Sequence, residues 1–139
     1  MEMTNSKKYN IVILNHHASA PDTGGGGRHY EIAKSLSEKG YTVTIIASSY
    51  SGRKNQYDFS EEIVTKKFND KFVFVRLKTK PAYKNQLTRF INYNDYKLKA
   101  SKYDKFETNP DVIIASSVHP LAWVAGYKLS KRYNAKFIV

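Results

Sequence analysis

The sequence lacks cysteine and has no long hydrophobic run. Without cysteine among its 139 residues, the chain has no disulfide, no thiolate metal site and no cysteine nucleophile. No stretch approaches the roughly 20 apolar residues that cross a bilayer. The first apolar run, residues 11–14, is too short for the core of a signal peptide. The sequence therefore predicts a cytoplasmic protein.

Acidic residues are also scarce. The chain has 12 Asp and Glu residues against 23 Lys and Arg residues, a formal net charge of +11. Such an excess favours a polyanionic partner, which could be nucleic acid, an anionic membrane surface or a phosphorylated ligand. Residues 76–105 carry nine of the basic residues and only two of the acidic ones. Most of the excess charge therefore belongs to one segment.

The hydrophobic pattern predicts a single α/β domain. Hydrophobic residues make up 41% of the chain and charged residues 25%, as in globular proteins. Short apolar runs predict buried strands, and 3.6-residue periodicity predicts helices between them. The expected strands are 9–15, 41–48, 71–77, 111–116 and one from 137; the expected helices are 28–39, 84–107 and 120–133. Residues 49–70 are expected to form a loop with room for a short helix or hairpin.

This alternation predicts a Rossmann-like, doubly wound parallel sheet with strand order 3-2-1-4-5. Gly40 and Asn134 stand where left-handed residues end the first and last helices. The chain stops inside a buried strand that has no helix to cover it. We therefore expect it to be the N-terminal part of a longer protein, or to be completed by a partner.

The loop after the first strand is rich in glycine. Gly24, Gly25, Gly26 and Gly27 precede Arg28, where a helix is expected to begin. Ligands of open α/β sheets bind beyond the carboxyl ends of the strands, and a helix N-terminus favours anions. No Gly-Lys-Ser/Thr follows, the spacing does not fit Gly-x-Gly-x-x-Gly, and no acidic residue ends the second strand. A phosphate contact without NAD is expected, and a flexible hinge is the structural alternative.

Polar residues follow the first and fourth expected strands. His16 and His17 come after the first strand, and Ser116, Ser117 and His119 come after the fourth. Both positions lie at the carboxyl edge, so the three imidazoles could line one crevice and orient hydroxyl groups. The serines could bind a sugar or phosphate, or only cap the next helix. No carboxylates stand at metal-ligand spacing with these histidines, which argues against zinc.

The basic segment is expected to form an amphipathic helix. Its apolar stripe, formed by Leu87, Phe90, Ile91 and Leu98, is expected to pack on the sheet. The opposite face is expected to face a membrane, and its residues are Arg89, Tyr93, Tyr96, Lys97, Lys99 and Tyr103. Tyrosines and cations suit an anionic membrane interface. They would also suit stacked single-stranded nucleic acid, or simply a solvated surface.

In order and spacing, residues 11–15, 24–33 and 36–45 resemble the opening of GT-B glycosyltransferases of family 4. The likeness is to bacterial polysaccharide-biosynthesis members similar to fucosamine transferases. Residues 78–83 and 111–120 resemble later segments of the same domain. The run of four glycines departs from the two that are commoner in the family.

The resemblance implies a two-domain hexosyltransferase of cell-envelope polysaccharide biosynthesis. It would move a sugar, with retention, from a nucleotide-sugar donor to a saccharide or polyprenyl-diphosphate-linked acceptor. It would act at the inner face of the plasma membrane, without a metal or other cofactor. Residues 1–139 would be the N-terminal acceptor-side domain, and the donor-binding C-terminal domain would lie outside this chain. The loop from Gly24 to Arg28 would meet the donor diphosphate, and the chain alone would be inactive.

Two alternatives remain open. The chain could be a non-catalytic subunit that recruits a separate donor-binding chain to a membrane. It could also be a phospholigand-binding or nucleic-acid-binding α/β module, with nucleic acid the less favoured ligand. The residues identify no catalytic group.

Overall fold

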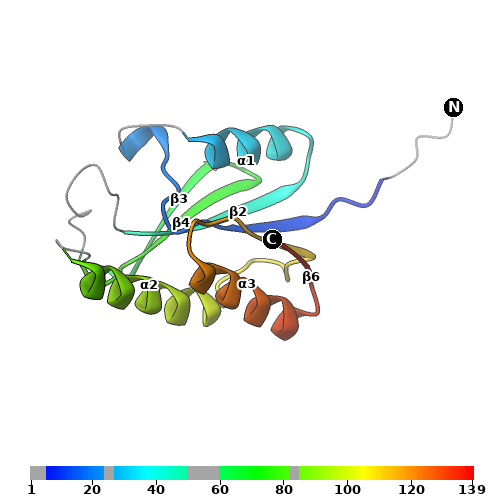
Figure 1. The fold of residues 1–139 in the computed structure, drawn as a ribbon. Helices are drawn as coiled ribbons and strands as arrows, with labels where there is room; N and C mark the ends of the chain where they lie inside the picture. Colours follow the sequence, from blue (N-terminus) through cyan, green and yellow to red (C-terminus); the bar gives the residue numbers. More distant parts are fainter. Residues whose placement is uncertain (1–5, 24–26, 50–59, 82–84) are drawn as a thin grey trace, which may run out of the picture.

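The computed structural model describes residues 6–23, 27–49, 60–81 and 85–139 of the chain. One sheet forms the middle layer, with helix α1 on one side and helices α2 and α3 on the other (Figure 1). The elements are β1 (Asn10–Leu14), the 3-10 helix η1 (Pro21–Thr23), α1 (Arg28–Glu38), β2 (Thr42–Ser48), β3 (Ile63–Asn69), β4 (Phe72–Leu77), α2 (Gln86–Ser101), β5 (Val112–Ala115), α3 (Pro120–Tyr133) and β6 (Lys136–Ile138).

The sheet has six strands in the order β3-β4-β2-β1-β5-β6. All neighbours pair in parallel except β3, which runs antiparallel to β4. This order differs from the predicted 3-2-1-4-5 because Ile63–Asn69, expected in a loop, form an edge strand. Only one side of an edge strand needs to be buried, and most of β3 is exposed. It therefore lacks the continuous apolar run that marks the inner strands. The other strands lie in the order β4-β2-β1-β5-β6.

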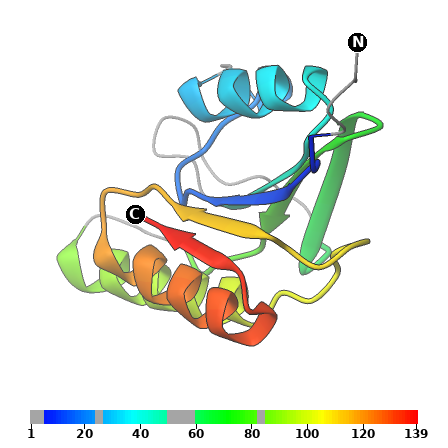
Figure 2. The same cartoon turned by 90° about the vertical axis from the view of Figure 1, so that its right-hand side faces the viewer.

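The core is divided by the sheet into two layers. Along β1, Ile11 and Ile13 face the layer beneath α1, while Val12 and Leu14 face the layer beneath α2 and α3. Helices α2 and α3 lie side by side on that second face (Figures 1 and 2). Because both faces are covered, the inner strands are apolar at successive positions.

The helix ends follow local chemistry. Gly40 has φ +91° after α1, and Asn134 has φ 52° after α3, so both left-handed positions are confirmed. Pro120 is the first residue of α3, where a missing N–H removes no helix bond. Helix α2 ends at Ser101, earlier than predicted. The Arg132 guanidinium donates to the carbonyl oxygens of Ser101 and Tyr103, at 2.7 and 2.9 Å, and so satisfies acceptors at this terminus.

The orientation of α2 is opposite to the prediction. The apolar stripe expected on the sheet is exposed, with Leu87 67% and Phe90 58% accessible. Two tyrosines expected to face a membrane, Tyr96 and Tyr103, are buried instead. The Tyr96 hydroxyl donates to the Ile46 carbonyl oxygen at 2.6 Å, so a phenol fills the core without leaving its polar atom unpaired.

Lys99 is also not free to face a membrane. Its ammonium group lies 3.0 Å from Glu62 and 3.6 Å from Asp95, and it donates to the Lys78 carbonyl oxygen. Of the other predicted membrane residues, Arg89 is exposed and Lys97 is half-buried. The basic residues of α2 therefore do not form one continuous outer face.

Candidate functional site

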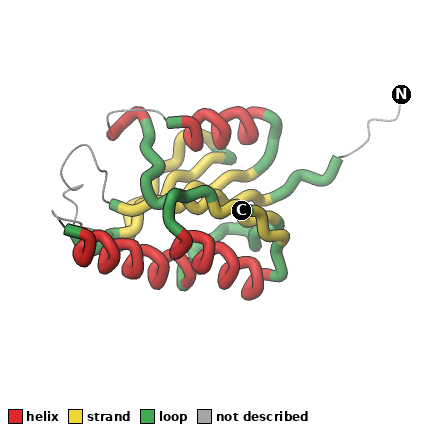
Figure 3. Tube along the Cα trace, in the orientation of Figure 1, coloured by secondary structure: helices red, strands yellow, loops and turns green. Residues whose placement is uncertain are grey.

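The carboxyl ends of β1 and β5 lie next to each other, because these strands pair from Ile11 with Val112 to Leu14 with Ala115. The segments that follow these two strands therefore leave the sheet at the same edge, beside α1 and α2 (Figure 3). Ring centroids of His16 and His119 are 5.0 Å apart, and those of His17 and His119 are 6.4 Å apart. The structure thus brings the three predicted imidazoles together. With Tyr93 they form the histidine cluster.

His16 is the buried support of the histidine cluster. Its side chain is fully buried, and its Nε2 lies 2.6 Å from Asn92 Oδ1. Asn92 Nδ2 donates to Thr79 Oγ1 and to the Lys80 carbonyl oxygen, so Oδ1 is the acceptor and His16 Nε2 carries the proton. His16 Nδ1 is then an acceptor, 3.3 Å from the ring nitrogens of His17.

Burial, followed by the nearby charges of His17 and His119, lowers the pKa of His16 to about 3. The imidazole is therefore neutral near neutral pH. Both its nitrogens have neighbours within the protein, Asn92 on one side and His17 on the other. The acceptor-orienting role of His16 stays a prediction, and such an effect would pass through His17 and Asn92.

His119 is placed differently. Its ring stacks on Tyr93 with centroids 4.1 Å apart and an angle of 8° between the planes. The residue is 6% exposed, yet neither ring nitrogen has a hydrogen-bond partner among the described residues. Burial, and secondarily His17, lowers the pKa of His119 to about 4. A neutral imidazole is thus held by stacking, with one donor and one acceptor unpaired.

The two serines after β5 have separate roles. Ser117 Oγ is buried and has no hydrogen-bond partner in the described part of the chain. Ser116 Oγ lies 3.0 Å from Nε2 of His29, a residue in the first turn of α1. Neither serine caps α3, because His119 is its N-cap residue. Ser117 and His119 therefore present unpaired polar atoms at neighbouring positions.

His29 was not singled out from the sequence, although it directly follows the glycine-rich loop. Asn15 Nδ2 lies 3.1 Å from its Nε2 and also donates to the Ser116 carbonyl oxygen. Burial, then the charge of Arg28, lowers the pKa of His29. These contacts bind the first turn of α1 to the ends of β1 and β5. Tyr93, expected to face a membrane, belongs to this site as well.

The N-terminus of α1 lies beside this edge. Gly27 is the N-cap residue and Arg28 the first helical residue, whereas Gly24, Gly25 and Gly26 lie outside the described residues. The start of this loop is anchored by Asp22, whose carboxylate lies 3.3 Å from the guanidinium of Arg76 and 3.3 Å from the ammonium group of Lys66. The end of the loop is fixed by His29. Backbone N–H groups at this terminus favour an anion.

Among the described residues, no group of three or more His, Cys, Asp or Glu side chains could hold a metal ion. The helices in the described ranges are all too short or too polar to cross a membrane.

Comparison with known proteins does not identify a family for this chain. The sequence matches no protein-family model, and no curated protein is significantly similar to it. A functional proposal therefore depends on the fold and on the chemistry of the carboxyl edge.

Proposed function

We propose that this chain is the acceptor-binding domain of a retaining glycosyltransferase of the GT-B type. The reaction moves a sugar from a nucleotide-sugar to a lipid-linked saccharide in cell-surface polysaccharide synthesis. The observation that carries the proposal is His119. A neutral, nearly buried imidazole, with neither nitrogen bonded to a described residue, suits a ligand with several hydroxyl groups: one can donate to the unprotonated nitrogen and another can accept from the N–H.

The surroundings of His119 favour orientation of an acceptor hydroxyl. Stacking on Tyr93 fixes the ring plane, and His16 lies edge-on at 5.0 Å. Ser117 Oγ offers a further donor and acceptor nearby in the chain. A pKa near 4 keeps His119 neutral, so it positions the hydroxyl rather than acting as a strong general base.

In the proposed reaction, the N-terminus of α1 would bind the donor diphosphate. The amide of Gly27 and the helix N-terminus at Arg28 would stabilise negative charge on the leaving diphosphate. Arg28 adds a formal charge at the same place. The nucleotide-sugar itself would be held by a separate donor-binding domain, which supplies the remaining groups. In this proposal the 139-residue chain binds acceptor without catalysing transfer.

Acceptor binding can be measured directly. In titration calorimetry, a farnesyl-diphosphate-linked N-acetylglucosamine should bind the chain. His119→Gln and Ser117→Ala should each weaken binding about tenfold, since each removes a hydrogen bond of about 1.4 kcal/mol. Ser101→Ala, on a partly exposed serine at the far end of α2, is the matched control. Equal binding of farnesyl diphosphate without the sugar would contradict the proposal.

A second proposal concerns the outer surface of α2 and α3. Exposed apolar side chains on these helices are Leu87, Phe90, Ile91, Leu98, Trp123, Val124 and Tyr127. Soluble proteins seldom expose so many large apolar groups on neighbouring elements. Arg89 and Lys128 are exposed on the same helices. We propose that this apolar surface rests on an anionic membrane, where cations meet lipid headgroups and apolar groups enter the interface.

Flotation with phosphatidylglycerol-containing liposomes tests the membrane proposal. Binding should be lost on Leu87→Ser with Phe90→Ser, and it should weaken with salt. Ile32→Ser is a matched control, because Ile32 is 44% exposed on α1, on the other face of the sheet. Unchanged flotation of the double variant would contradict the proposal. A saturable, salt-sensitive interaction with single-stranded oligonucleotide would instead favour the nucleic-acid alternative.

A further inference from the structure

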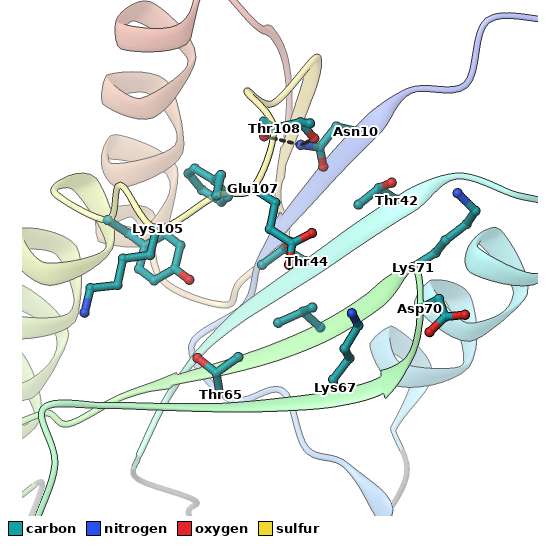
Figure 4. A pocket seen from close by; sticks show the side chains of 13 residues that line it. Asn10, Thr42, Thr44, Thr65, Lys67, Asp70, Lys71, Lys105, Glu107 and Thr108 are labelled. Carbon is teal, nitrogen blue, oxygen red and sulfur yellow. Dashed lines mark hydrogen bonds between the residues drawn. The ribbon is translucent and has the colours of Figure 1, made fainter.

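A second polar site lies at the opposite, amino edge of the sheet. A cavity of about 200 Å³ opens there on the face that carries α2 and α3. Its walls come from the first residues of β1 and β2, the middle of β3, the turn before β4, the start of β4 and the segment after α2 (Figure 4). No residue of the histidine cluster lines it.

The floor of this cavity combines hydroxyl and apolar groups. Thr42 and Thr44 alternate along β2 and so point to the same face of the sheet. Thr65 on β3 adds a third hydroxyl, while Val73 and Phe106 supply apolar wall. Hydroxyl groups beside a small apolar surface are typical of sites for polar organic ligands rather than for bare ions.

Opposite charges face each other across the space. Figure 4 shows the Glu107 carboxylate and the Lys67 ammonium group on opposite sides, each turned toward the interior. Lys71 stands at the rim. Within the described residues, none of these three side chains forms an ion pair. A strong acceptor and a strong donor are therefore held apart by a gap wide enough for another molecule.

Asn10 supplies an independent observation. Its side chain is 7% exposed, and Nδ2 donates to Thr108 Oγ1 at 3.0 Å and to the Thr108 carbonyl oxygen. These bonds fix the amide so that Oδ1 is turned away from Thr108. Oδ1 is buried and accepts no hydrogen bond from any residue that the structure describes. A buried acceptor of this kind destabilises the fold until a donor reaches it.

We propose that this amino-edge cavity binds a neutral, polyhydroxylated ligand the size of one monosaccharide. Ring hydroxyls can donate to Asn10 Oδ1 and to the Glu107 carboxylate while another ring oxygen accepts from Lys67. The C–H face of the ring packs against Phe106 and Val73. An inorganic phosphate would satisfy Lys67 but would meet the Glu107 carboxylate. The site is separate from the carboxyl edge, and the inference does not depend on the proposed function.

NMR titration of the 139-residue chain with D-glucose and N-acetyl-D-glucosamine tests the proposal. At least one sugar should produce saturable shift changes at the amides of Thr42, Thr44 and Lys67, with a Kd of about 1 mM. Glu107→Gln and Lys67→Met should each raise that Kd about tenfold. Both residues are exposed, so these variants should fold normally.

Glu38→Gln and Lys34→Met are the matched controls, since this exposed pair lies on α1, on the other face. They should leave the Kd unchanged. The proposal is overturned if neither sugar gives saturable changes, if the changes fall only on the histidine cluster, or if the control variants weaken binding equally. Stronger binding of inorganic phosphate than of either sugar would also overturn it. So would stronger binding of L-serine, a zwitterion whose two charges could pair with Glu107 and Lys67.

Discussion

The two edges of the sheet differ in how their polar groups are packed and hydrogen-bonded. At the carboxyl edge, imidazoles, amides and hydroxyls are packed and bonded to one another, with pKa values of about 3 for His16 and about 4 for His119. At the amino edge, Lys67 and Glu107 are exposed on a cavity, and neither forms an ion pair with another described residue. A buried network fixes geometry and makes stability depend on every member, whereas exposed charges can change with little effect on the fold.

The largest effect is expected from removing the amide that supports His16. Asn92→Ala removes the acceptor of the buried His16 Nε2–H and the donor to the Lys80 carbonyl oxygen, whereas Thr79 Oγ1 keeps Ser48 Oγ at 2.7 Å. We expect a loss of about 3 kcal/mol in the free energy of unfolding, because a buried donor and a carbonyl lose their partners and the space of the amide is left empty. Urea denaturation followed by circular dichroism measures it. Gln86→Ala, on an exposed residue of the same helix, should change stability by less than about 0.5 kcal/mol.

The second-largest effect is expected from acid, which should lower the free energy of unfolding through the histidines of the carboxyl edge. In the folded chain the pKa of His16 is about 3 and that of His119 about 4, against 6.5 when unfolded. Below pH 6.5 the unfolded state therefore binds more protons, so stability falls as the pH falls toward 4. From neutral pH to about pH 5.5 the loss should be about 1.2 kcal/mol for each histidine, or about 2.5 kcal/mol for the two together. Urea midpoints across this range test it, and a profile unchanged in His16→Gln with His119→Gln would contradict the assignment.

A smaller loss of stability is expected from a change on the buried, tyrosine-bearing face of α2. Tyr96→Phe removes the hydroxyl that donates to the Ile46 carbonyl oxygen at 2.6 Å and keeps the ring. The Ile46 carbonyl oxygen keeps the Asn15 N–H at 3.2 Å and loses only its second donor, at an expected cost of about 1 kcal/mol. Tyr127→Phe, on a tyrosine that is 51% exposed, should be neutral in the same denaturation experiment. Equal stabilities of the two variants would mean that Tyr96 does not face the sheet.

The strands and their order of occurrence could largely be predicted from local pattern. Residues 11–14 are apolar throughout, and residues 43–47 are apolar except for Thr44, which is distinctive of inner parallel strands. The bounds of α3 agree with the prediction, because Pro120 and Asn134 mark both of its ends. The edge strand β3 escapes the prediction because its sequence, with two adjacent lysines and no continuous apolar run, resembles an exposed loop.

The face of α2 that meets the sheet is a tertiary choice that local pattern did not decide. Apolar stripes exist on both sides of this helix, one aliphatic and one of tyrosines. The tyrosine side is buried because the Tyr96 hydroxyl finds a carbonyl and Asn92 finds His16. The same contacts bring Tyr93 onto His119, which depends on partners distant in the chain. The histidines could be placed at one edge from topology, but their separate states depend on these packed neighbours.

The smallest effect is expected at the amino edge. Glu107→Gln should change the free energy of unfolding by less than about 0.5 kcal/mol, because the carboxylate is exposed and has no ion pair among the described residues. Lys67→Met should be equally mild, since its ammonium group likewise forms no ion pair within the described ranges. Such results would show that neither charge stabilises the fold. This is expected of charged groups whose role is to bind a ligand. A loss above about 1 kcal/mol in either variant would mean that these side chains stabilise the fold, and the contrast between the two edges would fail.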